Sequence, residues 1–191
     1  MSNTSIHIHR HPLYITQPPT TKNRGFTIVE LLIVILVIAI LAAISIVAYN
    51  GVQNRAYDTT VQSDLRQTYT RIQEYNIVND TPFRVVSGTQ TGAQRAIINS
   101  VFVTTRSAYA TTGDTLLLCG SDDTITVVAR SKSGNGFYYS TTLGLGSFTN
   151  WPGDGNVSLC PAAGVPTNAT NYQFTWIKGG GGWESWFTAG K

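Results

Sequence analysis

The hydrophobic pattern of the chain is most uneven near its N-terminus, where a long apolar run begins. Residues 31–48 carry no charge over 18 positions, and Ser45 is the one polar side chain among them. A run of this length can cross the hydrocarbon core of a bilayer as a helix. Glu30 stands at its start, although an acidic side chain at the bilayer centre costs about 2.5–3.5 kcal/mol. The pattern predicts a membrane helix whose carboxylate needs a separate explanation.

A second helical pattern follows Gly51. Apolar residues recur at spacings of four, four, three and three, and they are Val61, Leu65, Tyr69, Ile72 and Tyr75. This spacing marks one face of an amphipathic helix. The opposite side is expected to hold the polar residues Asp64, Arg66, Gln67, Arg71, Gln73 and Glu74. Pro82 disfavours helical backbone at the residue before it, so the helix should end there or earlier.

The two patterns together predict one helix over about residues 26–78. Residues 26–49 form its apolar half, and residues 50–78 form an amphipathic half that packs on a globular head, residues 79–191. Asn50 and Gly51 lie at the junction of the two halves. A helix bends or melts most readily at such a position, because Gly adds backbone freedom and has low helix propensity.

The head is rich in Thr, Ser, Gly and strand-forming residues. Strands are predicted over residues 115–119, 124–131, 137–142 and 172–177, and a short helix is predicted over 93–102. The Ser-Gly-Asn-Gly segment at 133–136 has the composition of a hairpin turn. Residues 143–171 contain many Gly and Pro residues and are predicted as loops. The expected fold class is α+β, a long N-terminal helix with a small antiparallel sheet.

The distribution of charge argues against nucleic-acid binding. The net charge of +3 comes from residues 1–25, which contain Arg10, Lys22 and Arg24 and no acidic residue. The remaining ten Lys and Arg residues are balanced by ten Asp and Glu residues. A neutral body has no basic surface for phosphate groups. The positive flank before the apolar run places the N-terminus in the cytoplasm and the head outside.

The distribution of histidine argues against most enzyme chemistry. His7, His9 and His11 are the three histidines of the chain, and all lie within residues 1–25. The rest of the chain therefore cannot build a Ser-His-Asp or Cys-His nucleophile, or a histidine-ligated zinc site. We expect no catalytic residue, no metal site and no cofactor.

Cys119 and Cys160 are the two cysteines. If the head is exported, a disulfide between them is the natural interpretation, and it would stabilise the fold by about 2–4 kcal/mol. Two separate buried thiols are the alternative in a cytosolic protein.

The segment KNRGFTIVELLIVILVIAILAA, residues 22–43, resembles the N-terminus of a type IV prepilin. A basic leader ends in Gly25, Phe26 follows, Glu30 is the fifth residue after that glycine, and an apolar helix comes next. Each feature is common alone, but their ordered combination is specific. The resemblance covers about the N-terminal quarter of the chain. It departs from many type IV pilins at Val47, where they carry proline.

The resemblance implies a processing pathway. A prepilin peptidase would cut between Gly25 and Phe26, residues 1–25 would be removed as a leader, and the Phe26 amine would be N-methylated. The helix would hold the subunit in the cytoplasmic membrane until it joins the core of an extracellular filament. Its partners there would be other copies of the chain and minor pilins. The assembly platform and its ATPase would act indirectly.

Processing at Phe26 would supply a charged partner for the Glu30 carboxylate. The new ammonium group of Phe26 is costly to bury in an apolar bundle without a partner. The Glu30 carboxylate of a neighbouring, axially displaced helix can pair with it and so select the register of docking. The alternative is a glutamate that lies near the lipid headgroups of an ordinary signal anchor.

The sequence therefore predicts a structural subunit of a type IV pilus-like filament, with roles in adhesion, twitching motility or surface attachment. One alternative is a pseudopilin of a type II secretion system or a subunit of a DNA-uptake filament. A further alternative is a surface binding module on a membrane anchor.

Overall fold

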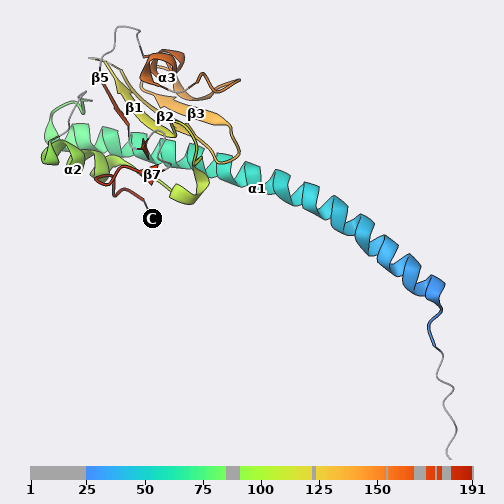
Figure 1. Ribbon diagram of the computed structural model, residues 1–191. Coiled ribbons are helices and arrows are strands. Elements are labelled where there is room, and N and C mark those ends of the chain that lie inside the picture. The colour runs from blue at the N-terminus through green and yellow to red at the C-terminus, as the bar shows by residue number, and fades with distance from the viewer. Residues whose placement is uncertain are drawn as a thin grey trace, which may run out of the picture. The chain divides into compact units, whose positions relative to one another are not determined.

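The computed structural model describes residues 25–84, 91–121, 124–153, 155–165, 171–174, 176–177 and 182–190. It comprises two compact units, Met1–Ile44 and Ser45–Lys191. Helix α1 (Ile28–Asn79) begins in the first unit and ends in the second (Figure 1). The predicted long helix is thus confirmed, and it continues without a break through Asn50 and Gly51. Flexibility at those two residues stays a prediction.

The apolar half of α1 is exposed on every side. Its large apolar side chains over residues 28–47 keep between 48% of their surface at Val37 and 84% at Ile28 accessible. Among the described residues, α1 is the one helix that is long and apolar enough to cross a membrane, judged by length and composition. A helix that is apolar all round needs an apolar environment, such as lipid or other helices.

The head is built on a five-stranded antiparallel sheet in the order β4-β3-β2-β1-β5. Its strands are β1 (Leu116–Gly120), β2 (Ile125–Arg130), β3 (Gly136–Ser140), β4 (Gly144–Ser147) and β5 (Asn171–Phe174). The other described elements are α2 (Gly92–Val101), the 3-10 turn η1 (Arg106–Ala108), α3 (Asn156–Ala162), and a two-stranded ribbon of β6 (Trp176–Ile177) and β7 (Gly182–Trp183). The α+β fold class is confirmed.

The predicted elements of the head are recovered unevenly. The helix predicted over 93–102 is α2, and the first three predicted strands are β1, β2 and β3. The prediction of loops over 143–171 was wrong in part, because this segment contains β4 and α3. The last predicted strand is divided between β5 and β6, which belong to different sheets.

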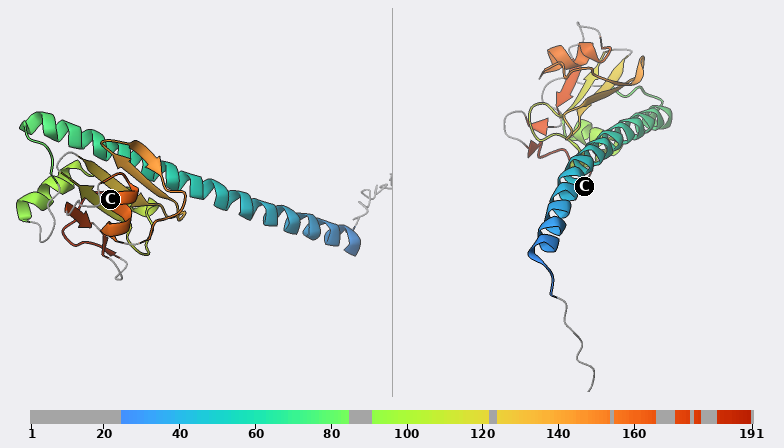
Figure 2. Two further views of the ribbon diagram at one scale, coloured as in Figure 1. Left: turned by 90° about the horizontal axis from the view of Figure 1, so that it is seen from above. Right: turned by 90° about the vertical axis from the view of Figure 1, so that its right-hand side faces the viewer.

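Alternate residues of the central strands face two separate cores. Leu116 and Leu118 of β1 join a first core with Val61, Leu65 and Ile72 of α1. Figure 2 shows the amphipathic half of α1, which contains these three residues, lying along one face of the sheet. Side chains alternate along a strand, so the intervening residues of β1 face away from α1.

The second core lies on the opposite face of the sheet, beneath α3. It consists of Leu117, Cys119, Val128, Leu159, Cys160, Ala163 and Val165. The sheet is therefore buried on both faces, which explains why all five residues of β1 are buried. A sheet with one wet face would show alternating polar residues instead.

Polar side chains of α1 bind loop backbone within the first core. Asp64 accepts hydrogen bonds from the Thr105 N–H at 2.6 Å and the Tyr109 hydroxyl at 3.2 Å. One turn later, the Thr68 hydroxyl accepts from the Val103 N–H at 3.0 Å and donates to the Val103 carbonyl at 3.3 Å. The sequence prediction that Asp64 lies on the polar outer side was wrong, since its side chain is only 3% exposed. Its hydrogen bonds satisfy the buried carboxylate.

Asp64→Asn is expected to weaken the pH dependence of the head's stability. Burial raises the pKa of Asp64 above its ordinary value of 3.8, and the hydrogen bonds from Thr105 and Tyr109 offset this only in part. The native state therefore holds this proton more tightly than the unfolded chain does. The stability contributed by this group is fully present below pH 3.8 and falls as the pH rises through the folded-state pKa.

Asn still accepts from Thr105 but does not titrate. Melting temperatures of the purified protein in detergent, measured from below pH 3.8 to neutrality, should show this fall in the native chain and not in the variant. Parallel pH profiles would contradict the prediction.

The segment 182–190 completes the first core. The Arg106 guanidinium lies over the rings of Trp183 and Phe187, at 5.1 and 5.6 Å from their centroids, and donates to the Phe187 carbonyl. Asn99 accepts from the backbone N–H of both Thr188 and Ala189. Phe187 is only 2% exposed. The first core therefore combines residues from α1, the sheet and this late segment.

Candidate processing and assembly site

The predicted cleavage position lies just outside α1. Gly25, Phe26 and Thr27 have no regular secondary structure, and the helix begins at Ile28. Phe26 is 88% exposed, and a side chain added at Gly25 would meet nothing within 4 Å. Exposed, irregular backbone of this kind is where proteases cut most readily. Gly25 and Phe26 are thus exposed and lie outside regular secondary structure.

Glu30 and Thr27 form a reciprocal cap at the start of α1. The Glu30 Oε2 atom accepts from the Thr27 backbone N–H and from the Thr27 hydroxyl, each at 2.8 Å. In return, the Glu30 N–H donates to the Thr27 hydroxyl oxygen at 3.2 Å. This is the capping box, in which two otherwise unpaired N–H groups of a helix start are satisfied.

The sequence interpretation missed this cap. Thr-Ile-Val-Glu at residues 27–30 has the Thr-x-x-Glu spacing of a capping box immediately before an apolar run. That signal is present in the sequence, although the charge pairing predicted for Glu30 does not depend on it. Thr27 is therefore a functional candidate that the structure adds.

Helix α2 supplies an internal comparison. Thr91 and Gln94 form the same box, with Thr91 N–H to Gln94 Oε1 at 2.8 Å and the Gln94 N–H to the Thr91 hydroxyl at 3.3 Å. The Thr91 hydroxyl also approaches Gln94 Oε1, at 3.2 Å. A neutral amide thus makes the same three contacts as the Glu30 carboxylate. Capping by itself does not require a charge at residue 30.

The second carboxylate oxygen of Glu30 remains available. Both contacts from Thr27 go to Oε2, and within the described part of the chain no donor reaches Oε1. A carboxylate can accept up to about four hydrogen bonds through its two oxygens. Glu30 can therefore cap its own helix and accept a further donor at the same time.

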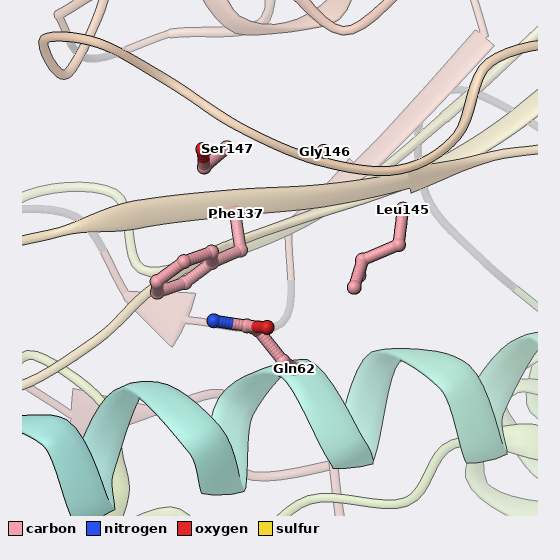
Figure 3. Close-up of a pocket in the computed structure, with 5 residues that line it drawn as sticks. All are labelled: Gln62, Phe137, Leu145, Gly146 and Ser147. Atoms are coloured by element: carbon pink, nitrogen blue, oxygen red, sulfur yellow. The ribbon is translucent and has the colours of Figure 1, made fainter.

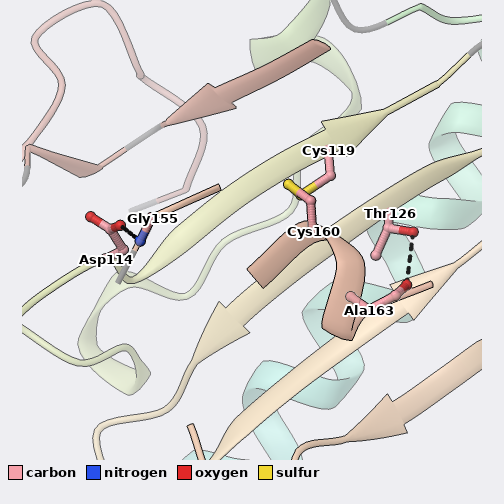
Figure 4. The surroundings of a disulfide bond; sticks show 6 residues. All are labelled: Asp114, Cys119, Thr126, Gly155, Cys160 and Ala163. Atoms are coloured by element: carbon pink, nitrogen blue, oxygen red, sulfur yellow. Dashed lines mark hydrogen bonds between the residues drawn. A yellow bond between two sulfur atoms is a disulfide. The ribbon is translucent and has the colours of Figure 1, made fainter. Parts of the chain in front are cut away.

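The cysteines are joined, as predicted for an exported head. Cys119 of β1 and Cys160 of α3 form a disulfide, with their Cα atoms 5.6 Å apart (Figure 4). Two hydrogen bonds hold the ends of α3 near the sheet. The Gly155 N–H donates to Asp114 Oδ2 at 2.5 Å, and the Thr126 hydroxyl donates to the Ala163 carbonyl at 3.3 Å. The disulfide lies within the second core, where it ties α3 to β1.

A shallow cavity of about 180 Å³ lies between α1 and the edge strand β4. Gln62 rises from α1 into the space between Phe137 and Leu145, as Figure 3 shows. Gly146 and Ser147 complete the lining, which has no charged side chain. Across the described residues, no group of three or more His, Cys, Asp or Glu side chains is placed to hold a metal ion. The lining of this cavity therefore lacks the paired acid and base groups of a catalytic site.

Residues 20–46 match the family model of the prokaryotic N-terminal methylation motif. This motif is typical of type IV pilin-like proteins. Gly25, Phe26, Thr27 and Glu30 all lie within the matched residues, so the capped start of α1 belongs to the motif. Comparison with curated proteins and with solved structures gives no match.

Proposed function

We propose that this pilin-like protein is the structural subunit of a type IV pilus-like surface filament. The precursor is anchored in the cytoplasmic membrane, is cut between Gly25 and Phe26, and is methylated on the new Phe26 amine. The observation that carries this proposal is the apolar half of α1, whose side chains are exposed all round over residues 28–47. Lipid covers them before assembly, and the same helices of neighbouring subunits cover them afterwards.

The surface of this half-helix suits helix packing. Leu32, Ile35, Leu36 and Ala39 line an open hollow on one face. Their spacing of three, one and three residues is the four-residue arrangement that receives a side chain from a facing helix. Ala39 is the smallest of the four and leaves room for that side chain. Copies of this chain and minor pilins are the proposed partners, and the peptidase, methyltransferase, assembly platform and ATPase act on them.

The charge of Glu30 serves assembly rather than capping. Gln94 shows that an amide makes the same cap. A negative charge gains only about 0.3–1 kcal/mol from the dipole of a helix start. Entering a membrane costs a carboxylate more than an amide. Pairing with the Phe26 ammonium of a neighbouring subunit would explain why a carboxylate stands here despite that cost. A wrong register would leave a buried charge unpaired, at about 3–5 kcal/mol.

The head forms the outer surface of the filament in this proposal. Its two cores and its disulfide make it a stable body outside the cell, where disulfides persist. Adhesion, twitching motility or surface attachment are the roles that such a surface would support.

Mass spectrometry of protein sheared from the cell surface tests the proposal. We expect an N-terminal peptide that begins at Phe26 and carries one methyl group on its amine. The same peptide without methylation should dominate in a strain that lacks the methyltransferase activity. A chain that begins at Met1 and stays in the membrane fraction would contradict the proposal, and it would favour a binding module on a signal anchor.

A further inference from the structure

We propose that the outer edge of strand β4 is an interface for a second copy of this chain, which adds its strand β5 to the sheet. The sheet of one head then continues into the sheet of the next. The partner is a neighbouring subunit, so the proposal rests on the filament proposed above. The contact belongs to the head alone.

The backbone of β4 has one side without a partner. Just beyond the last paired residues of β3 and β4, the Phe148 N–H donates to the Gly136 carbonyl at 3.0 Å. Hydrogen-bonded and non-hydrogen-bonded pairs alternate along an antiparallel ladder. Gly146 is therefore bonded to β3, whereas the N–H and C=O groups of Leu145 and Ser147 point outward. Among the described residues, β4 is the last strand on this side of the sheet, and no hydrogen bond reaches these outward groups.

The edge of β4 lacks the features that usually protect a free strand. Residues 143–149, Leu-Gly-Leu-Gly-Ser-Phe-Thr, contain no charged residue and no proline. The side chain of Leu143, which precedes the strand, is 57% exposed. Charged residues and proline on edge strands normally prevent pairing between molecules. The edge of β4 is therefore suited to pairing with another strand.

The shallow cavity of about 180 Å³ lies beside this edge. Leu145 and Ser147, which carry the outward backbone groups, line it together with Gln62 of α1. A strand that pairs with them would place alternate side chains at the mouth of the cavity. Strand addition gains affinity from main-chain hydrogen bonds and specificity from pockets for alternate side chains. The uncharged lining favours an uncharged side chain on the added strand.

The size of the edge indicates which partner it can hold. Strand β4 has four residues. One added strand of that length forms a much smaller interface than the about 1,200–2,000 Å² that stable complexes of free proteins bury. Such a contact is effective between molecules that are already held together, because tethering raises their effective concentration to about the millimolar range. Neighbouring subunits of a filament are held in this way by their apolar half-helices, so the occupant is a second copy.

The orientation of the subunits selects β5 of the neighbour. All subunits enter the filament from the membrane in one orientation, so no two-fold axis relates two heads and β4 cannot pair with another β4. The opposite end of the sheet is β5, and residues 171–177 contain no charged residue and no proline. Four successive antiparallel pairings separate β4 from β5, so these two strands run in the same direction. Heads in one orientation can therefore join β5 to β4 as a parallel pair, and this head-to-tail contact repeats without closing.

Cysteine crosslinking in sheared filaments tests the pairing. Ser147→Cys is combined in turn with Asn171→Cys and with Gln173→Cys. Residue 173 is in register with Leu118, on the face of the sheet that α1 covers, and the cavity beside Ser147 lies on the same face. Each subunit then carries one new thiol at each end of the sheet. After mild oxidation, we expect a ladder of dimers, trimers and longer products on a non-reducing gel from at least one of the two combinations.

Three controls accompany the crosslinking. Ser147→Cys with Phe174→Cys should give no ladder, because residue 174 is in register with Leu117 of the second core, on the opposite face. Ser147→Cys alone should remain a monomer on the gel. The double variants should also give no ladder in a strain without the assembly ATPase, where subunits stay in the membrane.

Ser147→Pro supplies a second measurement without new thiols. Proline removes the outward N–H and is tolerated on edge strands where this group faces away from the sheet. Loss of one hydrogen bond at each contact should lower the ratio of subunit in sheared filaments to processed subunit in the membrane by about two- to tenfold. Ser147→Ala keeps the N–H and should give the native ratio. The disulfide between Cys119 and Cys160, read by mass spectrometry, reports whether each head is folded.

Several results would overturn the proposal. These are the absence of a ladder from both double variants, a native ratio in a folded Ser147→Pro subunit, and dimers from Ser147→Cys alone, which would mean that β4 pairs with β4. A ladder without the assembly ATPase would also contradict it, because the contact would then not depend on the filament. If the native chain is not cut at Phe26 or is absent from filaments, the proposed function itself fails. Correctly cut native filaments without a ladder refute the β4–β5 contact alone.

Discussion

Glu30→Gln is expected to give a subunit that enters the membrane and is cut at Phe26 but forms no filaments. The Thr91–Gln94 box of α2 shows that glutamine can keep all three capping contacts. The substitution therefore removes the charge and leaves the helix start intact. Without the carboxylate, the Phe26 ammonium of each neighbour would be buried unpaired, at about 3–5 kcal/mol per contact. This corresponds to a loss of about two to four orders of magnitude in the association constant.

Glu30→Ala removes the charge and the side-chain half of the capping box, while the backbone N–H of residue 30 can still donate to the Thr27 hydroxyl. It should also abolish filaments while leaving membrane insertion intact. Subunit levels in the membrane fraction and filament yield after shearing measure the two effects separately. Gln94→Glu places the opposite change in the box of α2 and should leave filament yield unchanged. Normal filaments from Glu30→Gln would show that Glu30 acts as a cap alone, and the register hypothesis would then be abandoned.

Replacing both cysteines with alanine is expected to lower the free energy of unfolding of the head by about 4 kcal/mol. The disulfide joins residues 41 positions apart, and closing a loop of this length restricts the unfolded chain by about that amount. Cys119 and Cys160 also pack in the second core, at 0% and 5% exposure. Because small domains are stable by only about 5–15 kcal/mol, the loss is a large part of the total.

Chemical denaturation of the purified protein in detergent measures this change. The native chain unfolded with a reductant present should match the Cys119→Ala/Cys160→Ala variant to within about 1 kcal/mol, because both lack the same crosslink. The first core does not contain the disulfide, so tryptophan fluorescence near Trp183 should report a folded head at low denaturant in both cases. A variant as stable as the oxidised native chain would contradict the prediction.

The helices and strands that could be predicted from the sequence are those with a regular apolar pattern over a long stretch. The long helix was found from its apolar run and from the spacing of Val61, Leu65 and Ile72, and the three central strands were found from their apolar composition. Two predictions failed where a tertiary contact overrides local preference. Asp64 reads as a surface residue, and the donors that satisfy it come from Thr105 and Tyr109, about 40 residues later. No local pattern contains that information.

The strand β4 was missed for a related reason. Its Gly144 and Gly146 indicated a loop, since glycine weakens strands. In the structure, a side chain at Gly146 would lie 2.3 Å from the Tyr138 ring, so the aromatic side chain on the neighbouring strand needs a glycine opposite it. In the candidate site, Gly25, Phe26 and Glu30 could be picked out because they form a short linear motif, and their roles stay predictions. Only Thr27 was missed, although its spacing to Glu30 was visible.

The composition of the first core sets the order in which the protein can fold. That core joins Val61 of α1 to Phe187 and Ala189, and Asn99 and Arg106 hold the late segment across more than 80 residues. The early helix therefore emerges with an apolar face whose last covering residues have not yet been synthesised. Contacts so distant in sequence form slowly, and exposed apolar surface invites aggregation in the interval. A chain truncated before residue 182 should accordingly aggregate and be degraded more readily than the complete chain, which closes its own core.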